Sequence, residues 1–459
     1  MWCFSWILVF FLIIFSRISE AQDIKLLLYF RSQDPFTITI KKVEFEGKES
    51  NYFFNGPYTL NLSENNEGYL LAKVLLKEGD YGNAKLIYEI DGKVKETLFS
   101  FRVKRGVCFV SFSILKDGSV VLNKFSDSFS YVKENLLSVL LGSEGLVGFY
   151  DRISNKPAFF VGFTSDVSSF SSSYKYDMVY VSGKDNFLYT YDISMGNVEK
   201  IPIMRGSGPV STSVGYFNSG KEIVFVANGK TENVSIIDMD LKSEVGDIKV
   251  SGGPIKVFVD PPPDRLKDAS KEVLAYLENY RNLYVLSYYG AKLTIFQLSA
   301  WDGKVVAKRE YQTGWKPFNL FVDYKNGLFY VINEGSDFIN VGYIVIDQSS
   351  LFRLEGVGYN IVDGDYMSRS DMVILARSSP GELIFGRVPV TGLVYSSKFQ
   401  SYGGIGLEFT PFKLKYDSRA GCIYVVDKKK RKFFVFDELR RDLMDKFNVP
   451  GTPYDLLLF

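Results

Sequence analysis

The sequence of 459 residues contains no histidine. This absence excludes Ser-His-Asp and Cys-His catalysis, metal sites built on imidazole, and pH switches that depend on histidine. Cysteine is scarce too, with only Cys3, Cys108 and Cys422. Cys108 and Cys422 are too few to hold zinc without further sulfur or nitrogen ligands. In an oxidising compartment they can form a disulfide; two free thiols are the alternative, because the sequence does not fix their separation.

Neither sign of charge is in excess. The chain has 54 Lys and Arg against 53 Asp and Glu, a net charge of +1, so the sequence predicts no nucleic-acid partner. Hydrophobic residues make up 46% of the chain and aromatic residues 16%. This composition is sufficient for large cores and differs from that of a disordered chain.

Long hydrophobic runs are missing outside the N-terminus. Residues 7–15 have the length of the apolar region of a signal peptide, and Ser19-Glu20-Ala21 fits a cleavage site. The segment before this run lacks Lys and Arg, so an uncleaved anchor is the alternative. The apolar stretch is, however, shorter than the roughly 20 residues of a full span. We predict that residues 1–21 are a cleaved signal peptide. The mature protein is then secreted, periplasmic or on the cell surface, with no transmembrane span.

A unit of about 45 residues recurs along the larger, C-terminal part of the chain. It opens on a proline turn, as at Pro254, and continues with an alternating apolar strand at residues 255–259. A β-branched and aromatic strand follows, and a third strand closes on aspartate, as at Asp238. With a more polar fourth strand, the unit describes a propeller blade. One four-stranded sheet cannot bury both faces alone, so such sheets stack around an axis.

These repeats resemble YVTN-type β-propellers of the lactonase-like superfamily. The resemblance rests on the proline turn, on strands such as Phe329-Tyr-Val-Ile-Asn333 and on strands ending in Ile-Asp, such as Tyr343-Ile-Val-Ile-Asp347. It covers roughly residues 136–459. It implies an architecture and not a function, because such propellers serve as enzymes and as binding scaffolds alike.

The repeats also predict how the ring closes. Six complete units run from about residue 166 to residue 450, and three further strands between residues 136 and 161 lack an innermost partner. Residues 453–459 match an innermost strand without a unit of its own. Pairing them gives a seventh blade, so we predict an all-β protein whose residues 136–459 form a seven-bladed β-propeller. An eighth blade built from residues 107–134 is the alternative.

The N-terminal part follows another pattern. Residues 22–106 contain six predicted strands, with a hairpin turn at Asp91-Gly92. This pattern predicts a small β-sandwich of immunoglobulin-like type. Residues 107–135 are predicted to connect the sandwich to the propeller, as strands that pack on either part.

An insertion in the propeller predicts a helix over residues 264–280, after a run of three prolines. Asp264 or Ser270 can cap its start. We predict that the helix covers a blade edge; docking of a partner is the alternative. Its apolar stripe, at i, i+7, i+8 and i+11, is Leu266, Val273, Leu274 and Leu277.

Propeller geometry indicates where a ligand can bind. The loop that enters the innermost strand and the loop between strands two and three lie at the same end of a blade. We predict that Tyr288, Tyr289 and Trp315 lie near one another on this face, where aromatic side chains with polar neighbours suit a protein or carbohydrate partner. A chance cluster is the alternative, because the chain has 30 tyrosines. The candidate binding residues are Asn228, Lys230, Tyr288, Tyr289, Trp315, Asn333 and Glu334.

The sequence singles out no catalytic group. Paired carboxylates can catalyse hydrolysis without histidine, but no spacing distinguishes one pair among the acidic residues. Asp363 and Asp365 offer the oxygen ligands that calcium prefers; a simple turn is the alternative. We therefore expect no catalytic residue, no metal and no cofactor. The leading hypothesis is a non-catalytic propeller that binds a protein or glycan, with a lactonase-like hydrolase or a structural component of the cell envelope as alternatives.

Overall fold

The computed structural model describes residues 22–459 except 33–35, 47–50, 63–66, 77–78, 104–106, 116, 123–134, 346–350, 392–393 and 396. The predicted signal peptide lies outside the described residues. Almost all of the described structure is β-sheet, as expected, and the chain divides near residue 127 into two compact units. Among the helices of the described part, none has the length and apolar character needed to cross a bilayer.

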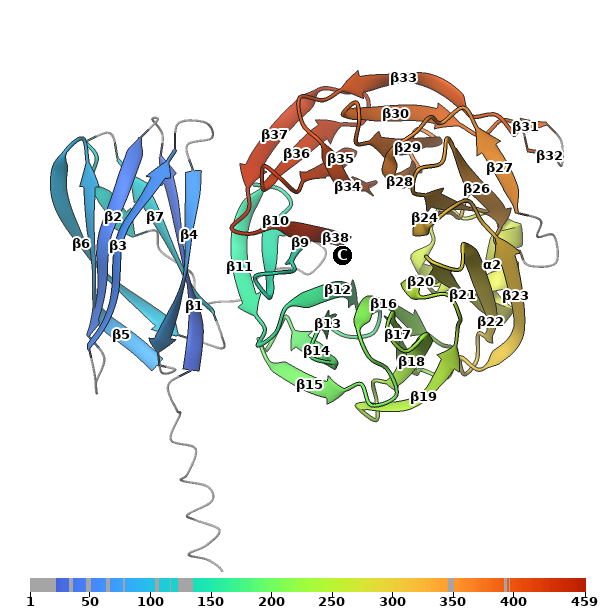
Figure 1. Cartoon of the computed structure of the whole chain (residues 1–459), viewed down its shortest axis with the longest axis horizontal. Coiled ribbons are helices and arrows are strands. Elements are labelled where there is room, and N and C mark those ends of the chain that lie inside the picture. The colour runs from blue at the N-terminus through green and yellow to red at the C-terminus, as the bar shows by residue number, and fades with distance from the viewer. Residues whose placement is uncertain are drawn as a thin grey trace, which may run out of the picture. The chain divides into compact units, whose positions relative to one another are not determined.

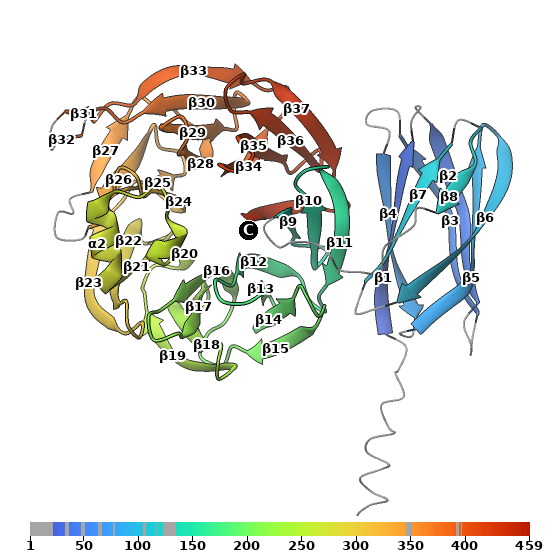
Figure 2. The same cartoon turned by 180° about the vertical axis from the view of Figure 1, so that it is seen from behind.

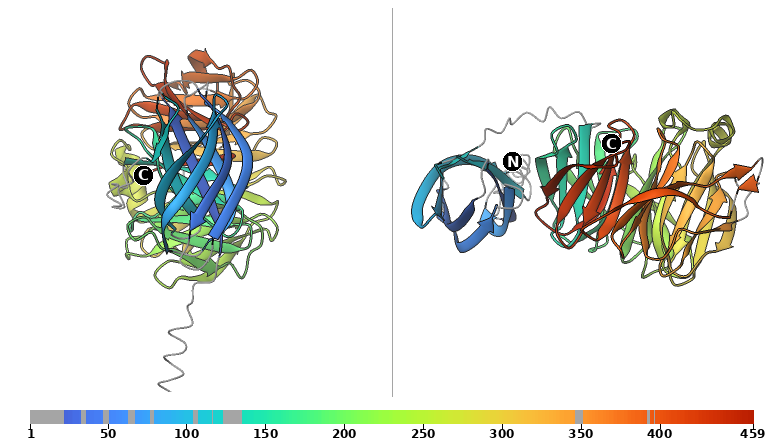
Figure 3. Two further views of the ribbon diagram at one scale, coloured as in Figure 1. Left: turned by 90° about the vertical axis from the view of Figure 1, so that its left-hand side faces the viewer. Right: turned by 90° about the horizontal axis from the view of Figure 1, so that it is seen from above.

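The first unit consists of two four-stranded sheets that share one core (Figure 3). Leu28 and Phe30 from one sheet pack in this core with Ile38 and Ile40 from the other. In spatial order, the first sheet is β4 (Glu67–Leu76), β1 (Gln22–Ser32), β7 (Val107–Ile114) and β8 (Val120–Leu122). The second sheet is β3 (Asn51–Asn61), β2 (Thr37–Glu46), β5 (Gly79–Ile90) and β6 (Lys93–Val103).

The segment expected to be a connection is part of this first unit. Strand β7 pairs in parallel with β1 over eight residue pairs, and β8 pairs with β7. Val110 and Phe112 of β7 are buried in the shared core. Of the two parts on which the strands of residues 107–135 were predicted to pack, β7 and β8 pack on the first unit, and they do not build an eighth blade. The immunoglobulin-like type of this unit stays a prediction.

The second unit is a ring of four-stranded antiparallel sheets around a central axis (Figures 1 and 2). Within the described residues there are seven such sheets. The first four are β9 (Leu136–Leu141), β10 (Leu146–Asp151) and β11 (Lys156–Gly162) with β38 (Pro453–Leu458); β12 (Val167–Ser172), β13 (Met178–Gly183), β14 (Phe187–Asp192) and β15 (Val198–Pro202); β16 (Pro209–Tyr216), β17 (Glu222–Asn228), β18 (Asn233–Asp238) and β19 (Ser243–Lys249); and β20 (Pro254–Val259), β21 (Tyr280–Ser287), β22 (Lys292–Ser299) and β23 (Val305–Gln312).

The remaining three sheets complete the ring. They are β24 (Pro317–Asp323), β25 (Leu328–Asn333), β26 (Phe338–Tyr343) and β27 (Phe352–Glu355); β28 (Ile361–Met367), β29 (Met372–Arg377), β30 (Glu382–Arg387) and β33 (Gln400–Gly406); and β34 (Pro411–Asp417), β35 (Cys422–Asp427), β36 (Lys432–Asp437) and β37 (Leu443–Asn448). A hairpin of β31 (Val390–Thr391) and β32 (Val394–Tyr395) is inserted before β33.

The C-terminal strand closes the ring. Strand β38 pairs antiparallel with β9, with Leu456 opposite Val139, and Leu456 is buried. Strands from both ends of the repeat region thus form one sheet, as the sequence predicted. An ion pair joins this closing sheet to the neighbouring one: the Arg152 guanidinium, just after β10, pairs with the Asp417 carboxylate at the end of β34. Their side chains are only 7% and 3% exposed, so this pair is shielded from solvent.

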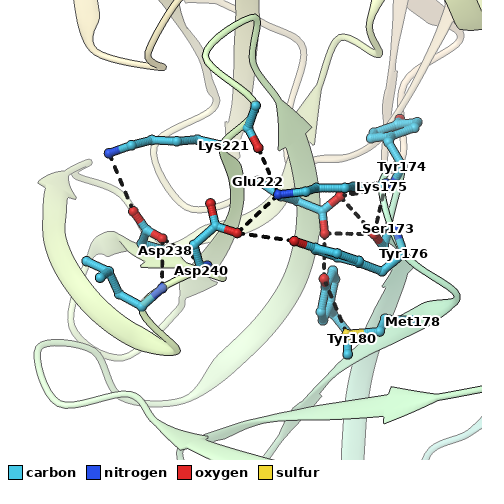
Figure 4. A network of polar contacts seen from close by, with 12 residues as sticks. Ser173, Tyr174, Lys175, Tyr176, Met178, Tyr180, Lys221, Glu222, Asp238 and Asp240 are labelled. Carbon is cyan, nitrogen blue, oxygen red and sulfur yellow. Dashed lines mark hydrogen bonds and ion pairs between the residues drawn. The ribbon is translucent and has the colours of Figure 1, made fainter. Parts of the chain in front are cut away.

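Buried carboxylates hold neighbouring blades together by binding backbone N–H groups. Figure 4 shows Glu222, which is fully buried at the start of β17. Its carboxylate accepts hydrogen bonds from the Tyr174 N–H at 2.9 Å, from the Ser173 hydroxyl at 2.7 Å and from the Tyr180 hydroxyl. All three donors belong to the preceding blade. They stabilise a negative charge that would otherwise be costly to bury.

The predicted helix is present but shorter than expected. A 3₁₀ turn, η2, covers Pro263–Arg265, and the helix proper, α2, covers Lys271–Asn279. It begins there because the Ser270 hydroxyl caps it and accepts from the Val273 N–H at 3.2 Å. Val273 and Leu277 are buried against Ile344 of the next blade. The helix thus covers the end of a blade, as predicted.

Breaking the Arg152–Asp417 ion pair tests how the closing sheet is joined to its neighbour. We expect Arg152→Met to lower the free energy of unfolding by about 3–5 kcal/mol, because it leaves the Asp417 carboxylate buried without its cation. Urea unfolding followed by tryptophan fluorescence measures the effect. The control is Lys242→Met, which breaks the exposed Lys242–Glu199 pair and should cost no more than about 1 kcal/mol. If both variants lose the same small amount of unfolding free energy, Arg152 and Asp417 do not form a buried ion pair.

A second buried aspartate makes stability depend on pH. Asp260 lies just after β20, fully buried, and accepts 3.0 Å hydrogen bonds from the Asn282 N–H and the Tyr324 hydroxyl. Burial outweighs these bonds and raises the pKa of Asp260 to about 7. Between about pH 4 and pH 7 the folded state holds a proton that the unfolded state has released. Stability from this group is therefore lost as pH rises through that window.

We expect Asp260→Asn to flatten the fall in stability between pH 4 and pH 7 relative to the wild type, because the uncharged amide has no proton to release there. Urea unfolding at half-unit pH intervals gives both curves. Parallel curves across this window would show that Asp260 ionises in the folded protein as it does in the unfolded chain.

Candidate functional site

Four side chains from two adjacent blades contact one another on the predicted loop face, and Trp315 directly precedes one of them in the chain. We call Tyr288, Tyr289, Trp315, Lys316 and Glu334 the aromatic patch. The two tyrosines follow β21, Glu334 follows β25, and Trp315 and Lys316 lie in the loop that enters β24. Because these three loops lie at the same end of their blades, residues 46 positions apart are brought into contact.

Tyr288 is fixed by its polar neighbours. Its hydroxyl donates a hydrogen bond to the Glu334 carboxylate, and this bond raises the pKa of Tyr288. The Lys316 ammonium lies 5.2 Å from the centre of the Tyr288 ring and 3.9 Å from Glu334 Oε2. A cation over the ring face and an acceptor at the hydroxyl hold the side chain from both ends. The base of the aromatic patch is thus ordered without a ligand.

Tyr289 and Trp315 present aromatic surface to solvent. The Tyr289 ring meets the Tyr288 ring edge-to-face, with centroids 5.2 Å apart and planes at 89°. It also lies over Gly253, where an added Cβ would come within 2.8 Å of the ring. Tyr289 is nevertheless 79% exposed, and Trp315, next to Lys316, is 65% exposed. Tyr289 therefore exposes its ring while it packs on the ordered Tyr288, and Trp315 exposes a second large aromatic side chain in the adjoining loop.

Asn228 and Asn333 do not belong to the exposed site. Both are buried at the end of a second strand, and the amide of each bonds to the residue seven positions on. Asn228 donates to Ser235 Oγ at 2.8 Å, and Asn333 donates to Asn340 Oδ1 at 2.9 Å. Both side chains bond to the neighbouring strand and do not face solvent, so nothing in the structure supports their prediction as binding residues. Their recurrence at one repeat position, with a polar partner at i+7, is the signal of this structural role.

Lys230 is exposed in the turn after β17, on the blade that precedes β20–β23. Its backbone N–H donates to the Ser207 carbonyl at 3.2 Å. No described contact joins it to the aromatic patch. The structure thus brings three of the seven predicted residues, Tyr288, Tyr289 and Glu334, into contact. It adds Lys316, which sequence reasoning missed although it follows Trp315 directly.

Asp363 and Asp365 lie within strand β28, so neither a calcium loop nor a turn describes them. Asp363 Oδ2 accepts from the Leu414 N–H at 2.9 Å, and Asp365 Oδ2 accepts from the Tyr416 N–H at 3.0 Å. These donors belong to the innermost strand of the next blade. Among the residues that the structure describes, no three acidic or cysteine side chains are placed to hold a metal. The two carboxylates join blades, and their candidacy as metal ligands was wrong.

Lysines balance these acidic groups along the innermost strands. Lys413 Nζ lies 4.0 Å from Asp363 and Lys415 Nζ lies 3.8 Å from Asp365. Burial lowers the pKa of Lys256, and the charges of Lys413, Lys415 and Asp363 also act on this residue. Charges of both signs alternate here, so the axis of the ring does not favour an ion of one sign.

Of the two alternatives for the cysteines, the free thiol is seen at Cys422. Cys422 is a free, buried thiol at the start of β35, with its sulfur 3.6 Å from the Ala420 carbonyl oxygen. Burial raises the pKa of this thiol, so it is unreactive as a nucleophile. Cys108 lies in β7 of the other unit, and its side chain is outside the described part. The alternative of a free thiol holds for Cys422.

Comparison with known proteins shows the fold. No model of a known protein family matches the sequence, and no curated protein matches it. Solved structures, in contrast, match this chain. A putative 6-phosphogluconolactonase from Bacteroides fragilis is 13% identical over 71% of this chain and 99% of that one, with a TM-score of 0.53. A second, from Bacteroides uniformis, is 12% identical over 71% and 99%, with a TM-score of 0.51.

A dihydro-heme d1 dehydrogenase, NirN, is 14% identical over 71% of this chain and 67% of that one, with a TM-score of 0.51. At these identities the likeness establishes a propeller-like fold and nothing about activity, because one fold hosts unrelated functions.

Proposed function

We propose that the protein is a secreted or cell-surface binding protein whose propeller holds a protein or glycan partner at the aromatic patch. The observation that carries this proposal is the exposure of Tyr289 and Trp315 on a base fixed by Lys316 and Glu334. Large exposed aromatic side chains are unfavourable in water and mark interaction sites. Because the base is already ordered, a partner gains contact area at a small cost in entropy.

The chemistry of the aromatic patch supports binding over catalysis. Its one carboxylate, Glu334, already accepts from the Tyr288 hydroxyl and lies 3.9 Å from the Lys316 ammonium. Such a group positions other side chains instead of exchanging protons with a substrate. Export is supported by the pattern of residues 1–21. The alternative of a lactonase-like hydrolase is supported by similarity of fold. The alternative of a structural component of the cell envelope differs from the proposal only in its partner.

Two variants test the proposal. We expect Tyr289→Ala and Trp315→Ala each to weaken partner binding at least roughly tenfold, as loss of an interface anchor does. The mature chain, residues 22–459, is probed on an array of defined glycans. It is also crosslinked to proteins of the host's surface fraction, so the two readouts separate a glycan from a protein partner. Both substitutions are at exposed positions, so thermal unfolding should stay unchanged.

The matched control is Tyr359→Ala, which removes another exposed tyrosine from the same face, in the loop that enters β28. It should bind like the wild type. If Tyr289→Ala and Trp315→Ala also bind like the wild type, or if all three variants lose binding equally, the aromatic patch is not the binding surface.

A further inference from the structure

A cavity of about 300 Å³ lies between the β24–β27 blade and the blade formed by β28, β29, β30 and β33. It is lined by residues that follow β24 and precede β29, in turns between first and second strands. Those turns lie at the opposite end of a blade from the loops of the aromatic patch. The cavity is therefore a separate feature, and Leu328 and Val373 give it a partly apolar wall.

An interruption of the repeat lies beside this cavity. In the following blade, β36 and β37 are joined by residues 438–442, whereas residues 388–399 separate β30 from β33. The longer connection contributes Val388 to the lining, and the strand that follows it contributes Gln400 and Tyr402.

Two carboxylates flank a single amide in the cavity wall. Asn326 Nδ2 lies 2.7 Å from Asp323 Oδ2 and 3.3 Å from Asp371 Oδ1. The Tyr366 hydroxyl donates to the same Asp371 oxygen. Asp323 is only 1% exposed, and its other oxygen, Oδ1, accepts from the Asn326 N–H at 2.9 Å. A carboxylate oxygen has two lone pairs, so each Asp323 oxygen keeps a second acceptor position.

The two carboxyl groups differ in their protonation. Burial raises the pKa of Asp323 to about 6. Burial also pushes the pKa of Asp371 upward, but the bonds from Tyr366 and Asn326 and the nearby charge of Lys325 outweigh it, and the pKa is lowered. Asp371 is thus a lasting acceptor of hydrogen bonds, whereas Asp323 gains a donor when it is protonated.

Two cations offset the charge of Asp371. Lys325 Nζ lies 3.3 Å from Asp371 Oδ1, and Arg387 Nη2 lies 3.9 Å from Asp371 Oδ2. The Arg387 side chain is held by the Asp371 and Ser370 carbonyl oxygens at 2.6 and 2.8 Å. Because charges of both signs stand at the cavity, the site favours an uncharged ligand rich in hydrogen-bonding groups over an ion.

An aromatic ring stands among the lining residues. Tyr402 is 45% exposed, and the Arg387 guanidinium lies 6.0 Å from the centre of its ring. A volume of about 300 Å³ equals the share of roughly ten waters in the liquid, which matches the dozen heavy atoms of one sugar ring. A sugar can pack its C–H groups on a flat aromatic ring while its hydroxyls donate hydrogen bonds to carboxylates beside that ring.

We propose that this cavity binds a single neutral sugar ring, whose hydroxyls donate to Asp323 and Asp371 and whose C–H face packs on Tyr402. The site goes beyond the binding function proposed for the aromatic patch and does not depend on it. It takes a small molecule into the junction of two blades, at the other end of the ring. No bond is made or broken in this proposal.

Titration calorimetry of the mature chain with glucose, galactose, N-acetylglucosamine and myo-inositol tests the site, with inorganic phosphate as a charged probe. We expect at least one of the neutral probes to bind and phosphate not to bind. Asp371→Asn should weaken that binding about tenfold, because a hydrogen bond to a charged acceptor is lost. Asp371 has a positive φ of 56°, a conformation that asparagine tolerates, so this variant keeps the backbone.

Tyr402→Ala should weaken binding about fivefold through loss of the aromatic face. The matched control is Tyr359→Ala, which should bind the small probe like the wild type. Binding that is lost in Tyr289→Ala but kept in Asp371→Asn would place the sugar at the aromatic patch and overturn the assignment to the cavity. The proposal is overturned if no neutral probe binds at millimolar concentration, if phosphate binds instead, or if Asp371→Asn and Tyr402→Ala leave the affinity unchanged.

Discussion

The pairing of β38 with β9 is the contact on which the second unit depends. Each blade buries its faces only against the blades beside it, so an open row would leave two apolar faces in water. The first three strands of the repeat region lack an innermost partner, and the last six residues of the repeat pattern provide it. Closure also fixes where each loop lies, and so it determines which loops can share a site.

Polar bonds between blades make this arrangement specific. Ser211 and Ser213 accept the N–H groups of Val257 and Val259 in the next innermost strand, and Asp363 does the same for Leu414. Burying a carboxylate for this purpose is tolerated because backbone donors surround it. These bonds fix the positions of neighbouring innermost strands relative to one another. The loops at both ends of the ring therefore have fixed positions too.

Sequence periodicity predicted most of the fold, because it reports burial within one repeat. The closing strand and the cap at Ser270 follow from such local patterns. The place of β7 does not, since it pairs in parallel with β1, about 80 residues away, and parallel pairing leaves no turn signal. The cavity was missed for a related reason: Asp323 and Asp371 belong to different repeats, and only the packing of two blades brings them together. Asn228 shows the opposite error, a polar residue near a turn whose burial the sequence did not reveal.

The central claim is that the ring is closed by its C-terminal strand, and hydrogen–deuterium exchange tests it directly. If β38 is an integral strand, the amides of residues 454–458 exchange as slowly as those of β9 and become labile together with them when the unit unfolds. Fast exchange of residues 454–458 while β9 and the strands of the other blades stay protected would contradict the closed ring.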